Sequence, residues 1–186
     1  VSVLVGDYLL ATSLTNAAMT GDVKLVELVG RLGQELSEGE IIQLNNTNAS
    51  NFSEDVYFEV IKKKTAALFA TAAEAGAISV KSTDEMAEMS RQFGELIGIS
   101  FQIKDDIFDY FEDGKIGKPT GNDLREGKVT LPLLYALNHA KGDDVKEMNE
   151  LIQRGDLTEE EIARLIDFAK REGGIDYAYS KMLEMQ

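Results

Sequence analysis

The sequence contains no cysteine, one histidine and two prolines among its 186 residues. The absence of cysteine excludes disulfides, thiolate metal sites and cysteine nucleophiles from this chain. His139 alone rules out a zinc site built from several histidines. Both prolines lie in the second half of the chain, and this scarcity favours long helices with short breaks.

Basic residues are in the minority. Lys and Arg number 19 against 33 Asp and Glu, so the formal net charge is -14. This charge argues against nonspecific nucleic-acid binding, because such binding needs cationic contacts with phosphates. An anionic substrate would need local help from placed lysines or from metal ions. No apolar run reaches the roughly 18 residues of a membrane-spanning helix, so we expect no integral membrane segment.

Apolar residues recur at helical spacing along most of the chain, and strand-like alternation is absent. The pattern predicts helices at residues 1–19, 22–37, 38–44, 53–75, 84–113, from 130 onward, 143–153, 158–172 and 175–185. Ser53 is the expected cap of one helix, and Pro132 falls in the first turn of another, where its missing N–H costs little. We therefore expect an all-α single domain, residues 1–186, that lacks its N-terminus because the chain begins without Met inside a helical pattern.

The segment of residues 97–111 combines a wide apolar arc with a narrow acidic one. On a helical wheel at about 100° per residue, its isoleucines and aromatic residues cover more than half of the circumference. The remaining arc holds Gln102, Asp105, Asp106 and Asp109, with Gly98 beside them. A helix with so wide an apolar arc is expected to be mostly buried.

Two interpretations of this acidic arc stay open. The first is a solvated helix face, which is the usual explanation. Against it, like charges three and four residues apart repel by a few tenths of a kcal/mol per pair, and the only nearby lysine, Lys104, lies on the apolar arc. The second is a metal site. Oxygen ligands without His or Cys select a hard cation, Mg²⁺ or Mn²⁺.

Lysines supply candidate phosphate contacts. The basic residues of the glycine-rich stretch after the acidic helix are Lys115, Lys118, Arg125 and Lys128. This stretch is either an exposed charged loop or, beside the acidic helix, part of a clamp around one diphosphate. Lys64 lies within an apolar helical stripe, followed by the Thr65 hydroxyl. Its ammonium either snorkels to solvent or points into a cavity beside an anionic ligand.

Five blocks of the chain resemble, in order, the trans-type polyprenyl (isoprenyl) diphosphate synthases. Residues 101–109 (FQIKDDIFD) match the family's second aspartate-rich motif, and residues 117–132 match the stretch after it. The other blocks are residues 6–11 (GDYLLA), residues 38–40 with Gln43, and residues 64–65. The lysine before the aspartate pair and the acidic block at 38–40 are most similar to long-chain bacterial members, such as octaprenyl diphosphate synthase.

The resemblance implies an antiparallel helical bundle around a central cavity, assembled as a homodimer. It also implies a Mg²⁺-dependent prenyltransferase that condenses isopentenyl diphosphate head-to-tail onto an allylic diphosphate. The residues that it places at the metal are Asp105, Asp106 and Asp109, with Asp105 as a direct ligand. The residues that it places on the allylic diphosphate are Lys64, Lys118 and Lys128. Those that it places near the reacting carbons are Lys64, Thr65 and Gln102.

Some family features have no counterpart in this sequence, namely the first aspartate-rich motif, the arginines after it and the last helices. We therefore expect a partial domain, incomplete at both ends, that is inactive alone. Two rival functions stay open: a non-catalytic subunit of a heteromeric prenyl synthase, and a class I terpene cyclase, whose second metal motif normally mixes Asn, Ser or Thr with acids. A third is an acidic helical adaptor without a ligand. The expected location is the cytoplasm, with peripheral membrane contact during product release left open.

Overall fold

The computed structural model describes residues 1–46, 53–111 and 120–185, and these segments contain helices and no strand. The helices are α1 (Ser2–Met19), α2 (Val23–Asn45), α3 (Glu54–Ile61), α4 (Ala67–Ser79), α5 (Asp84–Phe108), α6 (Asn122–Arg125), α7 (Leu131–His139), α8 (Asp143–Arg154), α9 (Glu159–Arg171) and α10 (Gly174–Glu184). A π-helical turn, Lys62–Ala66, joins α3 to α4. The predicted all-α fold is confirmed. Within the described segments, no helix has both the length and the apolar character needed to cross a membrane.

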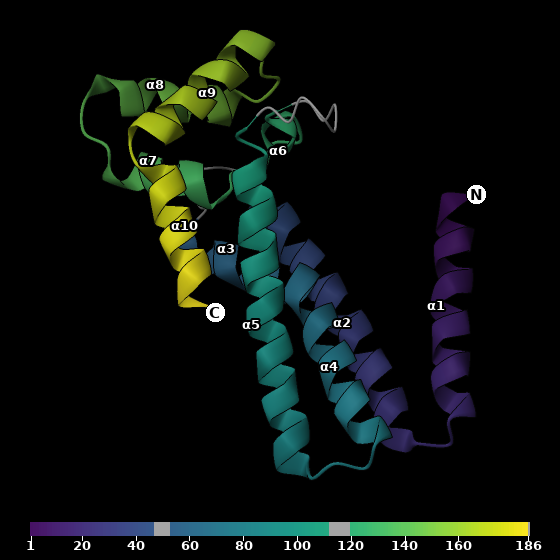
Figure 1. The fold of residues 1–186 in the computed structure, drawn as a ribbon. Coiled ribbons are helices and arrows are strands. Elements are labelled where there is room, and N and C mark those ends of the chain that lie inside the picture. The colour runs from purple at the N-terminus through teal and green to yellow at the C-terminus, as the bar shows by residue number, and fades with distance from the viewer. Residues whose placement is uncertain (47–52, 112–119, 186) are drawn as a thin grey trace.

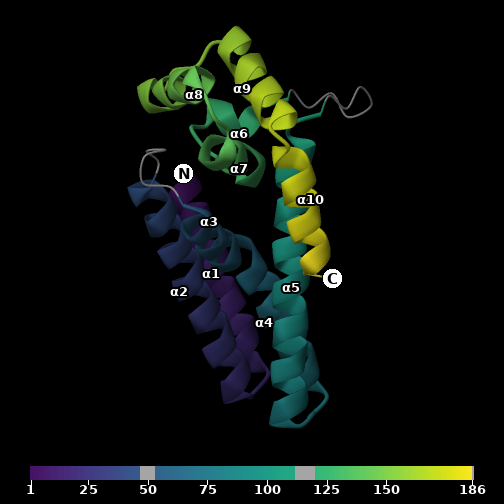
Figure 2. The ribbon, with the colours of Figure 1, turned by 90° about the vertical axis from the view of Figure 1, so that its left-hand side faces the viewer.

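The long helices run antiparallel to their neighbours along the chain (Figure 1). α1 packs on α2, α2 packs on α4, and α4 packs on α5. α10 returns along the other side of α5 (Figures 1 and 2). The shorter helices α6 to α9 gather at one end of this layer, where α7 packs between α9 and α10. That end also receives the C-terminus of α5, so the acidic segment of the sequence lies where the two groups of helices meet.

Several helix boundaries follow from local signals, and those at Ser53 and Pro132 were predicted. The Ser53 side chain accepts a hydrogen bond from the Val56 N–H and caps α3. Pro132 lies in the first turn of α7. Residues 158–161 form a reciprocal capping box at the start of α9.

Other predicted boundaries were wrong. The two helices expected at 22–37 and 38–44 are one helix, α2. Gly39 does not break it; a Cβ there would lie 2.8 Å from Lys63 Cβ, so glycine allows α2 to approach the π-helical turn. The helix expected to end at residue 75 continues through Gly76 to the end of α4. α5 ends five residues before the predicted residue 113, at Phe108, and α6 was not predicted.

The best-buried residues join α5 to the shorter helices. Ile103 of α5 and Leu131, Leu133 and Leu165 of α7 and α9 are fully buried. The prediction that the helix with this apolar arc is mostly buried holds for only half of the arc. The half that carries Ile103 packs in the core, whereas Phe101 is 54% exposed on the other half. The core therefore fixes the position of the C-terminal end of α5 and leaves its other face open.

Candidate active site

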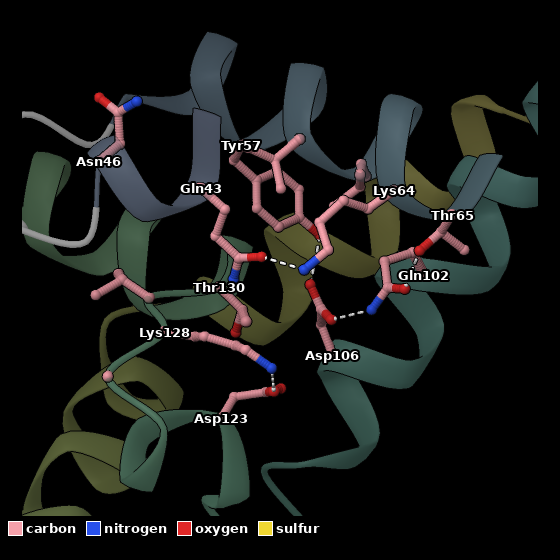
Figure 3. A pocket seen from close by; sticks show the side chains of 14 residues that line it. Gln43, Asn46, Tyr57, Lys64, Thr65, Gln102, Asp106, Asp123, Lys128 and Thr130 are labelled. Carbon is pink, nitrogen blue, oxygen red and sulfur yellow. Dashed lines mark hydrogen bonds and ion pairs between the residues drawn. The ribbon is translucent and has the colours of Figure 1, made fainter. Parts of the chain in front are cut away.

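A cavity opens where α2, α3, the π-helical turn, α5 and the segment 123–130 meet (Figure 3). Its polar lining includes Gln43, Lys64, Thr65, Gln102, Asp106 and Lys128. Apolar side chains of Val60, Ile61 and Val129 complete the wall. The lining residues come from segments that lie up to 87 positions apart in the sequence, from Gln43 to Thr130. The cavity therefore exists only in the folded chain.

The π-helical turn places Lys64 and Thr65 in this wall. Such turns insert one extra residue into a helix and occur frequently at functional sites. Gly98 of α5 packs directly against the turn, because a Cβ at this position would lie 2.5 Å from the Ala66 Cα. The close approach brings the Thr65 hydroxyl to the Gln102 side chain, where it donates a hydrogen bond to Oε1 at 2.8 Å. Two residues predicted to share the reaction site are thus in contact.

A hydrogen-bond chain continues from Gln102 to Asp106. The Gln102 amide Nε2 donates to Asp106 Oδ1 at 2.7 Å. The Tyr57 hydroxyl donates to Asp106 Oδ2 at 2.6 Å. Tyr57 and Asp106 are each only 3% exposed. Both oxygens of this carboxylate therefore have partners, as buried polar groups require (Figure 3).

The electrostatics of the site favour a cation. Burial, with a smaller contribution from the charges of Asp123 and Asp105, raises the pKa of Asp106 to about 7, although the hydrogen bonds from Tyr57 and Gln102 act in the opposite direction. Burial and the nearby Asp109 charge likewise raise the pKa of Asp123. Carboxylates that raise one another's pKa are stabilised in their charged form by a nearby positive ion. This wall of the cavity is therefore suited to a metal ion or an ammonium group.

Two lysines face the same space. Lys64 Nζ donates to Gln43 Oε1 at 2.5 Å and forms an ion pair with Glu40. Lys128 Nζ pairs with Glu126 at 2.5 Å and lies 3.8 Å from Asp123 Oδ1. Figure 3 shows the Lys64 ammonium joined to Gln43 and the Lys128 ammonium directed toward Asp123. The structure thus places Lys64 in a cavity wall. Lys115 and Lys118 lie outside the described residues.

The three predicted metal-site aspartates have different surroundings. Asp105 is exposed, whereas Asp106 and Asp109 are buried. Asp106 lines the cavity, and the Asp109 carboxylate accepts hydrogen bonds from backbone N–H groups of Asn122 and Asp123. In the described segments, no three carboxylate or histidine side chains are grouped so that they alone could hold a metal ion. The acidic arc seen on the helical wheel therefore does not form a single three-carboxylate cluster.

Two residues of this site were not assigned a role from the sequence. Asp123 contributes a second carboxylate to the cavity wall. In the sequence, Asp123 is an acidic residue within a basic, glycine-rich stretch that already matched a family block, and this could have indicated a role in the site. Tyr57 lies in the same stripe as Lys64, but its contact with Asp106 spans 49 positions. Helical spacing alone gives no indication of such a partner.

Comparisons with known proteins identify the family. A polyprenyl synthetase family model matches residues 1–169. Octaprenyl diphosphate synthase of Escherichia coli (strain K12) is 37% identical over 155 residues, covering 83% of this chain and 48% of that protein. The crystal structure of geranylgeranyl pyrophosphate synthase from Bacteroides thetaiotaomicron superposes with a TM-score of 0.92 at 53% identity, covering 99% of this chain and 61% of that one.

A second crystal structure is equally similar in fold. Polyprenyl synthase from Caulobacter crescentus CB15, complexed with calcium and isoprenyl diphosphate, superposes with a TM-score of 0.92 at 37% identity. The match covers 99% of this chain and 56% of that one. This chain spans about half the length of the curated relatives that it matches. Because the family model covers most of the chain, the chain belongs to the polyprenyl synthetase family.

Proposed function

We propose that the protein carrying this chain is a trans-polyprenyl diphosphate synthase. It condenses isopentenyl diphosphate head-to-tail with an allylic diphosphate and releases inorganic diphosphate. The observation that carries this proposal is the pairing, in one cavity, of two lysines with the carboxylates of Asp106 and Asp123 beside Thr65 and Gln102. Lysines suit the diphosphate, and the carboxylates suit the cation that accompanies it.

The diphosphate of the allylic substrate would lie between Lys64 and Lys128. These lysines come from different segments and face the same space (Figure 3). Lys118 is proposed as a third contact on the basis of the family block alone. In the structure, Lys64 is held by Glu40 and Gln43, and Lys128 is held by Glu126 and Asp123. Binding of an anion would exchange these partners for phosphate oxygens.

The proposed metal is Mg²⁺, with Mn²⁺ as a substitute. The carboxylate of Asp105 is exposed, and the carboxyl groups of Asp106 and Asp123, whose pKa values are raised, lie nearby. An incomplete set of protein oxygens fits Mg²⁺, because this ion usually completes its shell with waters and substrate phosphates. When bound, the metal neutralises charge on the departing diphosphate. The Caulobacter crescentus relative, complexed with calcium and isoprenyl diphosphate, supports this assignment.

The remaining chemistry needs dipoles and no nucleophilic side chain. The allylic C–O bond breaks, and the diphosphate leaves with the electron pair. The Thr65 hydroxyl donates a hydrogen bond to Gln102, so the lone pairs of the Thr65 oxygen are available to the positive allylic carbon. The double bond of isopentenyl diphosphate then forms the new C–C bond, and the released diphosphate accepts the proton lost from the adjacent carbon.

We also propose that the intact protein is a homodimer. The support is α1, which packs on α2 yet exposes Leu4, Tyr8, Leu9 and Leu10. An apolar helix face of this size marks an interaction surface. Light scattering on a size-exclusion column measures the assembly directly. A monomer at micromolar concentration would contradict the proposal.

The test of the activity uses the intact protein with isopentenyl diphosphate, farnesyl diphosphate and Mg²⁺, followed by mass analysis of the products. A ladder ending at a defined polyprenyl length is the expected result. Lys128→Ala should lower kcat/KM by about 10²-fold, as expected for loss of one group that stabilises a developing anion. Lys24→Ala is the matched control, because Lys24 pairs with Asp84 on the surface. A folded, Mg²⁺-loaded protein without any product would favour the non-catalytic subunit instead.

A further inference from the structure

Asp109 makes an unusual set of contacts for a residue of an aspartate-rich motif. It is 6% exposed and lies directly after α5. Its Oδ1 accepts from the Asn122 N–H at 3.0 Å, and its Oδ2 accepts from the Asp123 N–H at 3.0 Å. Its own carbonyl accepts from the Gly121 N–H at 2.8 Å. One residue thus holds three consecutive backbone amides.

The first turn of α6 explains why these amides need a distant partner. The cap position of this helix is Gly121, whose φ of 73° favours glycine, and it provides no capping side chain. A Cβ at this position would lie 2.4 Å from Ile162 Cγ2. No serine, threonine or aspartate therefore fits where an ordinary cap residue would be. Asp109 supplies the missing acceptors from 13 and 14 positions away.

The anchored segment carries two groups of the cavity. The Asp123 N–H is one of the three amides that Asp109 holds, and the Asp123 carbonyl accepts a hydrogen bond from the Lys128 N–H at 2.8 Å. Leu124, 6% exposed, fixes the other side of the segment in the core. The backbone positions of Asp123 and Lys128 are therefore set relative to α5 through Asp109.

We propose that Asp109 is a positioning residue, which holds Asp123 and Lys128 across the cavity from Asp106. Both Asp109 oxygens are engaged with backbone amides, whereas Asp105 of the same motif is exposed. The carboxylates of the motif thus have different roles: Asp106 lines the cavity, and Asp109 holds the segment that forms the opposite wall. This inference rests on the proposed function for its catalytic consequence but not for its structural basis.

Hydrogen exchange on the metal-free intact protein tests the anchor without any activity. Peptides covering residues 120–128 should exchange faster in Asp109→Asn and faster still in Asp109→Ala. Asparagine keeps one acceptor oxygen and alanine keeps none. Loss of hydrogen bonds to a charged acceptor predicts an acceleration of roughly tenfold or more. Asp105→Asn is the matched control and should leave this exchange unchanged. Circular dichroism shows whether each variant retains its helices.

Two further measurements separate positioning from metal ligation. Mn²⁺ titration followed by electron paramagnetic resonance, without substrate, should show binding weakened at least tenfold by Asp105→Asn and less than threefold by Asp109→Asn. In turnover assays, Asp109→Asn should raise KM for the allylic diphosphate more than it lowers kcat, and its effect should not add to that of Lys128→Ala.

Unchanged exchange in both Asp109 variants, or equal loss of Mn²⁺ binding in Asp105→Asn and Asp109→Asn, would overturn the proposal. An inactive wild-type protein would instead refute the proposed function. The exchange and Mn²⁺ results would still decide the role of Asp109.

Discussion

Replacing Gly98 by alanine should destabilise the protein, although alanine is normally the better helix former. A Cβ at this position would lie 2.5 Å from Ala66 Cα, 2.9 Å from Ala66 Cβ and 3.1 Å from Phe69 Cδ2. Carbon atoms in contact prefer about 3.5–4.0 Å, so α5 and the π-helical turn would have to separate by about 1 Å. Ala66 is fully buried, and the nearest clash is with its backbone, so no flexible side chain can give way.

The magnitude follows from two opposing contributions. Overpacking a well-filled interior costs about 1–3 kcal/mol, and the upper part of that range applies because a backbone must move. Replacing glycine by alanine within a helix returns up to about 1 kcal/mol. The net loss in the free energy of unfolding for Gly98→Ala is therefore about 1–2 kcal/mol. The corresponding fall in Tm is roughly 2–8 °C for a chain of this size.

Gly76→Ala is the matched control, because Gly76 lies inside α4 and a Cβ there meets nothing within 4 Å. It should raise the free energy of unfolding by about 0.4–1 kcal/mol. Urea unfolding of both variants, followed by circular dichroism, measures the difference. Equal stabilisation by the two substitutions would refute the close approach of α5 to the π-helical turn. Gly98→Ala should also lower activity, because the same approach holds Thr65 on Gln102.

Two further predictions concern hydrogen-bonded carboxylates. Tyr57→Phe should lower the free energy of unfolding of the metal-free protein by about 1–3 kcal/mol, because a buried Asp106 oxygen loses its donor. Tyr179→Phe, at a tyrosine that is 53% exposed, should change nothing in the same urea titration. The hydrogen bond from Arg154 lowers the pKa of Glu161 to about 2. The advantage of wild type over Glu161→Gln should therefore be complete above pH 4.5 and disappear as the pH falls through about 2. An advantage that grows on acidification would contradict this.

The fold could be predicted from the sequence wherever short-range signals decide it. Ser53 and Pro132 start helices because caps and first turns depend on neighbouring backbone groups. The helix end predicted at Gly76 was wrong, and so was the break predicted between residues 37 and 38; in sequence, a glycine that ends a helix looks like one that lies within it. Gly39 sits against the π-helical turn, whereas Gly76 meets no neighbour, and both remain helical. Only the three-dimensional neighbours distinguish these roles.

In the site too, contacts between neighbouring residues could be predicted from the sequence, whereas contacts between distant residues could not. Helical spacing correctly grouped Gln102 with Asp106, because residues four apart on a helix are neighbours, and these two share a hydrogen bond. It also grouped Asp109 with them, but in the structure that carboxylate accepts hydrogen bonds from the backbone N–H groups of Asn122 and Asp123. The determining fact is the shape of the interior at Gly121, where Ile162 leaves no room for a side chain. A requirement created by α9 is thus met by a residue at the end of α5. An aspartate-rich motif can therefore serve a second purpose that is visible only in the folded chain: the structure of one wall of the cavity depends on the carboxylate of Asp109 at the end of α5.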